Sequence, residues 1–252
     1  MWDKSAKPVV IEVPAGSYHI GDELVPDASP RHEKHFAESF WIDRFPVSWR
    51  DYETFVAGGG YGKQELWRRA GADSDWQMPD SVDASCRGLI ESSGPLRNRL
   101  SGKVHQSSDL PLTGLSWFAA QAFCSFFSAR LPFESEWEAA MQGAQPTSQH
   151  DPFTQHSVWR GSFSCECLPG LIEEWTADAF SPCYWRADGY NRGHHLKSAG
   201  GSSDASVRGA PPGTSGFTIS WRKGKSPNET SPYRGFRRVW DMLPSDLPVW
   251  GE

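Results

Sequence analysis

Short runs of alternating apolar residues, separated by long polar segments, predict most of the strands of this chain. Alternation over residues 9–21, interrupted by the turn sequence at 14–17, predicts two short strands joined as a hairpin. Residues 40–47 predict a further strand that ends at a proline. Three brief strands are expected toward the C-terminus, near residues 172–176, 217–221 and 235–240.

Three helices are predicted where a start signal precedes apolar residues at helical spacing. Ser48 and Asp51 form a capping-box pattern, and glycines 58–60 supply the end of this first helix. A second, central helix should follow Ser116, because its apolar face extends over three turns. A third, short helix should start at Glu134 with acids in its first turn. The buried stripe of the first helix is expected to consist of Trp49, Tyr52, Phe55 and Val56.

These elements indicate one α+β domain over residues 1–252 with abundant irregular loops. Residues 61–110 lack periodicity and are expected to form an ordered loop held by Trp67 and Trp76. The 24 glycines and 19 prolines leave little room for long helices, so helical bundles and coiled coils are excluded. The 13 tryptophans suit such a chain, because indoles can fill an irregular interior while their N–H groups bond to the backbone.

The charge pattern argues against nucleic acid and membrane as direct partners. The net charge is −6, and no run of lysines and arginines forms a basic patch. No apolar stretch approaches a membrane-spanning length, and the first residues lack the pattern of a signal peptide. The five cysteines lack the spacing of a disulfide scaffold or a structural zinc site. A reducing, cytoplasmic location is therefore expected.

Several segments in a fixed order resemble the formylglycine-generating enzyme (sulfatase-modifying factor) family. They are residues 13–21, 40–48, 130–138 and 174–178, followed by Gly200-Gly201-Ser202 and residues 235–239. The resemblance implies a C-type-lectin-like core with a small twisted antiparallel sheet, two main helices and much irregular backbone. The family includes copper-dependent oxidases, iron-dependent sulfoxide synthases and noncatalytic binding proteins, some of them diversified by retroelements. The fold alone therefore does not fix the function.

The metal chemistry of the family transfers poorly to this chain. The oxidases bind copper through two cysteines between the landmarks that correspond to Gly201 and Gly235, and this chain has no cysteine there; its last one is Cys183. The iron-dependent relatives share residues 59–61 and 66–67, but they take histidines from a separate N-terminal domain, for which no room is expected here.

Two further departures concern calcium and an aromatic anchor. The family pattern that supplies calcium ligands reads Leu171-Ile172-Glu173-Glu174-Trp175 here. The resemblance therefore implies that Glu174 keeps one oxygen ligand of a weakened structural Ca²⁺ site, while Leu171 cannot replace the usual asparagine. The usual tryptophan after Gly-Gly-Ser is Ser203.

Cysteines and histidines that could bind metals also have structural interpretations, which we favour. Cys124 falls on the apolar face of the second helix and is expected in the core. Cys165 and Cys167 could chelate a soft metal, but two thiolates fill only half of a tetrahedral site. His32 and His35 would point to opposite faces of a strand.

Other polar pairs are weighed in the same way. Glu134, Glu136 and Glu138 resemble paired catalytic carboxylates, yet they match a structural landmark of the family, so a scaffolding role is favoured. His194 and His195 are adjacent on a glycine-flanked loop and would need a third ligand to hold an iron ion.

Residues 202–234 mix polar, charged and aromatic side chains without a period, which is typical of an exposed recognition loop. The leading hypothesis is a noncatalytic or diverged family member that binds a protein or peptide ligand through this C-terminal face. The rival hypothesis is an iron- or copper-dependent oxidase that uses a set such as His194, His195 and Cys183. A third is an interaction subunit of a larger assembly. The predicted ligand contacts are Ser203, Asp204, Arg208, Trp221, Arg222, Lys223, Asn228, Glu229 and Tyr233.

Overall fold

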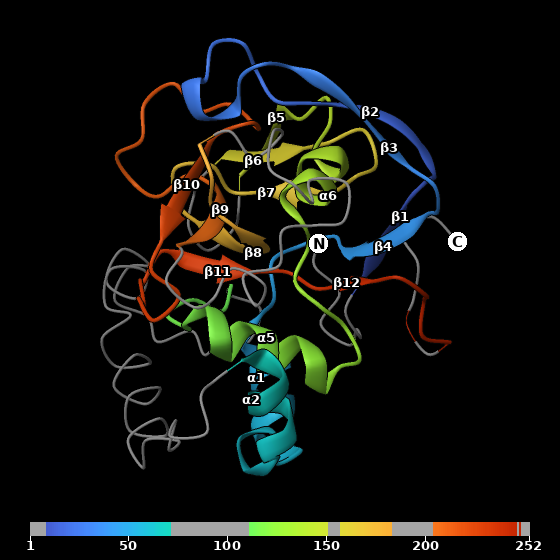
Figure 1. Ribbon diagram of the computed structural model, residues 1–252, viewed down its shortest axis with the longest axis vertical. Coiled ribbons are helices and arrows are strands. Elements are labelled where there is room, and N and C mark those ends of the chain that lie inside the picture. The colour runs from blue at the N-terminus through green and yellow to red at the C-terminus, as the bar shows by residue number, and fades with distance from the viewer. Residues whose placement is uncertain (1–8, 72–110, 151–156, 183–203, 246, 248–252) are drawn as a thin grey trace.

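The computed structural model describes residues 9–71, 111–150, 157–182, 204–245 and 247. Within these residues the chain has the α+β fold that the sequence predicts (Figure 1). It has four small sheets and four α-helices, whereas the sequence predicts one small sheet and three helices. One sheet has the order β10-β9-β8-β11 and another the order β1-β4-β12. The two remaining sheets are β2-β3 and β5-β6-β7.

The strands are short, and every pairing between the described strands is antiparallel except that of β11 with β8. Their bounds are β1 Val10–Val13, β2 Gly16–Ile20, β3 His32–Phe36, β4 Phe40–Asp43, β5 Gln145–His150, β6 Ser157–Arg160, β7 Glu166–Cys167, β8 Glu173–Ala179, β9 Ala205–Gly209, β10 Arg222–Lys225, β11 Arg234–Phe236 and β12 Val239–Trp240. The helices are α1 Trp49–Ala57, α2 Gln64–Ala70, α5 Trp117–Phe126 and α6 Glu134–Ala140, with 3₁₀ turns η1 Pro26–Ala28 and η2 Gly60–Gly62.

The hairpin predicted over residues 9–21 is wrong in its pairing, although both strands exist. β1 pairs with β4, whereas β2 pairs with β3 in a different sheet. Ile11 lies opposite Ile42 in this register, and both are buried. Alternation predicts a strand and its buried face, but the partner is chosen by apolar surface elsewhere in the chain.

Helix α1 begins and ends where the sequence predicts. The Ser48 hydroxyl accepts from the Asp51 N–H, and the Asp51 carboxylate accepts from the Ser48 N–H, so the capping box is formed. Tyr52 and Phe55 are buried, but Val56 is 39% exposed, so the stripe is narrower than expected.

Helix α2 corrects the expectation of an irregular loop after residue 61. It ends at Gly71, which has a φ of 84° that favours glycine. Trp67 is buried, its Nε1 donates to the Gly60 carbonyl, and its ring stacks on Tyr61. Seven residues are too few to show a clear helical period. Trp76 lies outside the described residues.

Helix α5 is central, as predicted. Ser116 caps its N-terminus, and Trp117 Nε1 donates to the Thr176 carbonyl of β8 at 2.8 Å. In Figure 1, α5 crosses below β11 and β12, with α1 and α2 on its far side. Phe123 of α5 is fully buried, with its ring centroid 5.2 Å from those of Phe55 and Phe236. No helix in the described ranges is long and apolar enough to cross a membrane.

The C-terminal strands differ in detail from the prediction. Residues 217–221 form no strand; β10 starts only at Arg222. The strand expected over 235–240 is two strands, β11 and β12, which belong to different sheets. The connecting residues are Arg237 and Arg238, both buried. The short connection between the two sheets therefore consists of two arginines whose guanidinium groups lie in the interior.

Candidate functional site

The sheet β10-β9-β8-β11 has two faces of different chemistry. Trp175 of β8 lies opposite Val207 of β9, and both belong to the apolar core against α5. On the other face Arg208 of β9 lies between Glu174 of β8 and Arg222 of β10. Two arginines directly opposite each other would repel, so this face requires carboxylates from another element.

Helix α6 supplies these carboxylates. Glu134 accepts from Arg222 Nη2 at 2.5 Å and lies 3.0 Å from Arg208 Nε. One turn later, Glu138 accepts from Arg208 Nη1 at 2.8 Å. Glu138 also accepts from the Ser220 hydroxyl and from the Gly21 N–H. The two acids therefore tie β9, β10 and the loop before β10 to one helix, the scaffolding role favoured from the sequence.

The electrostatics of this cluster shift the pKa values of two neighbouring carboxyl groups in opposite directions. Burial opposes ionisation of Glu134, but the guanidinium groups of Arg222 and Arg208 outweigh it and lower the pKa of Glu134. Asp178 of β8 accepts from the Glu134 N–H at 2.5 Å. Burial, together with the charge of Glu134, raises the pKa of Asp178 to about 8. Glu136 faces elsewhere and forms a bidentate pair with Arg130.

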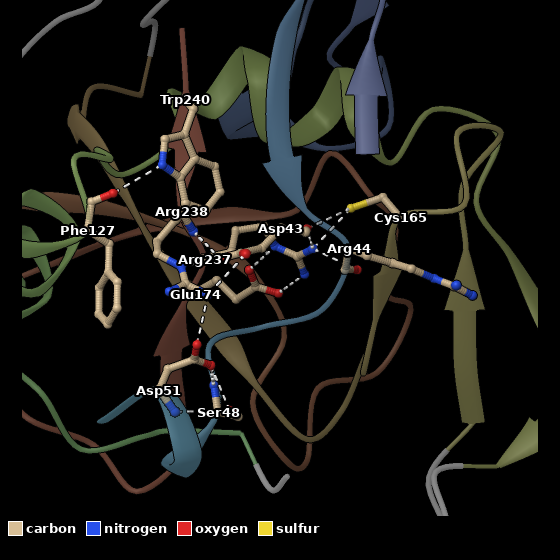
Figure 2. Close-up of polar contacts among 10 residues, drawn as sticks. All are labelled: Asp43, Arg44, Ser48, Asp51, Phe127, Cys165, Glu174, Arg237, Arg238 and Trp240. Atoms are coloured by element: carbon tan, nitrogen blue, oxygen red, sulfur yellow. Dashed lines mark hydrogen bonds and ion pairs between the residues drawn. The ribbon is translucent and has the colours of Figure 1, made fainter. Parts of the chain in front are cut away.

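A second buried network surrounds Arg237 (Figure 2). Its guanidinium donates to both oxygens of Glu174, at 2.6 and 2.7 Å. It also donates to Cys165 Sγ at 3.0 Å and to the carbonyl oxygens of Asp43 and Glu166, each at 3.0 Å. The pKa of Arg237 is raised, because its anionic partners outweigh the effect of burial.

This network corrects the expectation that Glu174 is a calcium ligand. Both of its oxygens face a guanidinium, and Glu174 Oε2 also accepts from Trp137 Nε1. A cation placed there would be repelled by Arg237. Leu171 is packed in a small apolar cluster. The residues present therefore do not fit the calcium site that the family pattern implies.

Arg238 forms the adjacent part of the network. It donates to Asp43 at 2.8 Å and to Asp51 of the α1 capping box at 3.1 Å. Its guanidinium carbon lies 4.9 Å from the Phe127 ring centroid and 5.4 Å from that of Trp240 (Figure 2). Burial raises the pKa of Asp43, and Arg238 acts against this rise.

The described cysteines have the properties of core residues. Cys124, Cys165 and Cys167 are buried and free. Burial raises the pKa of each thiol, that of Cys165 to about 12. They are therefore thiols, not thiolates, near neutral pH, which disfavours metal binding and nucleophilic chemistry. Among the described residues, no group of three or more His, Cys, Asp or Glu side chains is arranged to hold a metal ion.

The residues predicted to contact a ligand differ widely in their exposure. Asp204, Lys223, Asn228 and Glu229 are exposed, whereas Trp221 and Tyr233 are partly buried. Arg208 and Arg222 are at most 2% exposed, so the expectation that they lie on an exposed loop is wrong; their charges pair with Glu134 instead. Ser203 and the rival set Cys183, His194 and His195 lie outside the described residues.

Lys225 belongs to this surface but is not among the contacts that the sequence predicts. Trp221, Lys223 and Lys225 are spaced by two residues along β10 and its start, so they share one face of the strand. The period of two could have identified Lys225, had the strand been placed four residues further along the chain. His32 and His35 lie in β3, where a strand directs them to opposite faces.

Solved structures share this architecture. PvdO from Pseudomonas aeruginosa superposes with a TM-score of 0.60, at 17% sequence identity, over 93% of this chain and 98% of that one. Treponema denticola variable protein 1 gives a TM-score of 0.52 over 91% of this chain and 94% of that one, at 15% identity. These likenesses define a formylglycine-generating-enzyme-type, C-type-lectin-like fold, as predicted.

Residues 3–164 match the sulfatase-modifying factor enzyme 1-like domain, and the chain belongs to that family. The inactive C-alpha-formylglycine-generating enzyme 2 of Mus musculus is 22% identical over 273 aligned positions, which cover 91% of this chain and 85% of that protein. Hercynine oxygenase of Mycobacterium tuberculosis is 31% identical over 102 residues, 40% of this chain and 23% of that protein. The chain spans less than half the length of the hercynine oxygenases that it matches.

Proposed function

We propose that this protein is a noncatalytic or diverged member of its family that binds a protein or peptide ligand through its C-terminal face. This face is defined here as the exposed and half-exposed side chains of residues 204–233. One observation carries the proposal. Exposed side chains such as Lys223 lie on or beside strands β9 and β10, and the buried arginines of these strands pair with buried Glu134.

The buried ion pairs favour binding because they pre-organise the face. Arg222 Nη1 donates to the carbonyls of Asp27 and Ser181, so the start of β10 is fixed to two further loops. The Ser220 hydroxyl bonds to Glu138 and fixes the residue next to Trp221. A ligand that meets an ordered surface loses less conformational entropy on binding. Trp221 and Tyr233 are of the residue types that dominate binding energies.

The sequence and the relatives also favour binding over copper chemistry. The chain has no cysteine between Gly201 and Gly235, where the family's oxidases place their copper ligands. A relative named as inactive spans almost the whole chain, and a variable protein shares the fold. A diversified binding protein would vary at Trp221, Lys223 and Tyr233 and keep the buried arginines.

A random peptide library displayed on phage and selected on the immobilised full chain tests the proposal. Selected peptides should lose most of their affinity on Trp221→Ala, because truncating such an anchor typically weakens binding by about tenfold or more. The control His35→Ala lies on the exposed side of β3 and should change nothing. A library that yields no peptide dependent on Trp221, Lys223 or Tyr233 would refute binding through this face.

The rival function is a metal-dependent oxidase, and the hercynine oxygenase match supports it. Metal analysis of the purified chain separates the two. Stoichiometric iron or copper, lost on His194→Ala together with an oxygen-consuming activity, would establish the rival. A chain without such metal-linked activity, whose peptides bind at Trp221, would establish the binding function.

A further inference from the structure

We infer that the ligand of the C-terminal face is an extended acidic peptide segment that adds to the free edge of β10 as a further strand. The inference rests on the proposed function and specifies its partner and its mode of binding. It depends on three properties of β10: an edge without a strand partner among the described residues, one face that is fixed by buried contacts, and basic side chains on the opposite face.

Strand β10 has β9 as its only strand partner among the described residues. Figure 1 shows β10 at the outer margin of its sheet, with β9 on the inner side. In an antiparallel pair only alternate residues direct their backbone N–H and C=O groups at the partner strand. The others point away from β9, where an added strand could bond to them.

The face of β10 that carries Arg222 and Gly224 is held in place by buried contacts, so the edge of the strand is ordered before any ligand binds. Arg222 is held by Glu134, and its guanidinium carbon lies 4.6 Å from the Phe180 ring centroid. Gly224 packs so closely on Phe180 that a Cβ atom would lie 2.7 Å from Phe180 Cδ1. Strand addition therefore requires ordering of the peptide alone.

The outer side of β10 selects the charge of the added strand. Lys223 is exposed and Lys225 half-exposed. Along the strand they alternate with Arg222 and Gly224, whose side of the strand is packed against the protein. Lys223 Nζ lies 6.0 Å from the Trp221 ring centroid, so the aromatic ring adjoins the basic pair. Acidic residues spaced by two on the added strand would lie opposite the lysines.

The same lysines disfavour a second copy of this chain as the occupant. In registers that keep the outer sides of two β10 strands on one face, ammonium groups lie opposite one another and repel. A separate consideration for the acidic peptide is the net charge of the chain, which is −6 and would repel it at long range. That repulsion is screened beyond a Debye length of about 8 Å in physiological salt, so the adjacent lysines dominate.

The probe is a fluorescently labelled peptide that alternates glutamate with valine and threonine, measured by anisotropy against the full chain. Two comparison peptides carry lysine for glutamate, or N-methyl groups on alternate residues, which keep the charges but remove backbone donors. The variant Lys223→Glu/Lys225→Glu reverses the charge of the edge. Its matched control, Arg68→Glu/Arg69→Glu, makes the same charge change on exposed residues of α2.

We expect saturable binding of the acidic peptide, weakened about tenfold by the lysine pair variant, and less than about twofold by the control. N-methylation should weaken binding about tenfold as well, because the added strand loses its ladder. Absence of saturable binding would overturn the inference. So would binding that tolerates N-methylation, or binding that the two double variants weaken equally.

The failure of this inference differs from failure of the proposed function. Library peptides that depend on Trp221 but lack alternating acids would overturn strand addition and leave binding through the face in place. A library without any peptide that depends on this face would remove both.

Discussion

Replacing Arg237 with methionine should lower the free energy of unfolding by about 5 kcal/mol, close to the whole stability of many domains. Methionine keeps an unbranched apolar stem but removes the partner of Glu174 (Figure 2). Leaving one charge of a buried pair without its partner costs about 3–5 kcal/mol. The carbonyls of Asp43 and Glu166 would also lose a donor, at roughly 1 kcal/mol or more each. These contributions are not fully additive.

Urea denaturation followed by far-ultraviolet circular dichroism measures this loss. The matched control is Arg69→Met, which removes an arginine that is 68% exposed and paired with Glu65; it should change stability by less than about 0.5 kcal/mol. The double variant Arg237→Met/Glu174→Gln should be less destabilised than the sum of the single variants, because neither buried charge remains. A loss below about 1 kcal/mol for Arg237→Met would refute the assigned role of the network.

Two further predictions concern buried titratable groups. Because the pKa of Asp178 is raised to about 8, the folded chain keeps a proton that the unfolded chain releases near its ordinary pKa of about 3.9, so this group lowers stability as pH rises between those values. Asp178→Asn removes the dependence, and its stability relative to wild type should increase by roughly 1 kcal/mol or more from pH 5 to pH 8; a constant difference in urea titrations would contradict the raised pKa. Cys124, Cys165 and Cys167 should resist iodoacetamide at pH 8 in the folded chain and react after denaturation, as peptide mass spectrometry can measure, whereas rapid native labelling would contradict their burial.

The sequence predicts the helices with strong start signals and misses the one without them. Helices α1 and α5 have Ser48 and Ser116 as caps, followed by residues at helical spacing. Helix α2 has no side-chain cap at Lys63 and only seven residues, so its signal is too short to separate it from a loop. The partner of a strand is harder to predict than the strand itself, because alternation defines a buried face but not the strand that pairs with it.

The sequence does not reveal which of the predicted ligand contacts face solvent. Arginine is mostly exposed in proteins, so the sequence alone predicts Arg208 and Arg222 at the surface. Their burial depends on Glu134 and Glu138, which lie 70 to 88 positions earlier in the chain. Such distant pairs leave no local pattern in a single sequence. The exposed members, such as Lys223, follow from strand alternation once the start of β10 is known.

The division between buried arginines and exposed neighbours has a consequence for how this face could change. Arg208 and Arg222 form ion pairs with acids in the interior, Arg208 with two of them. The geometry of such buried pairs is strict, so substitution of either arginine would cost much of the folding stability. Lys223 and Asn228 are exposed, and substitutions at such positions usually alter stability by less than about 0.5 kcal/mol. Ligand specificity could therefore change at the outward positions without loss of the fold. Catalysis at the same surface would impose the opposite pattern, because a reactive group and its supports must keep both identity and geometry.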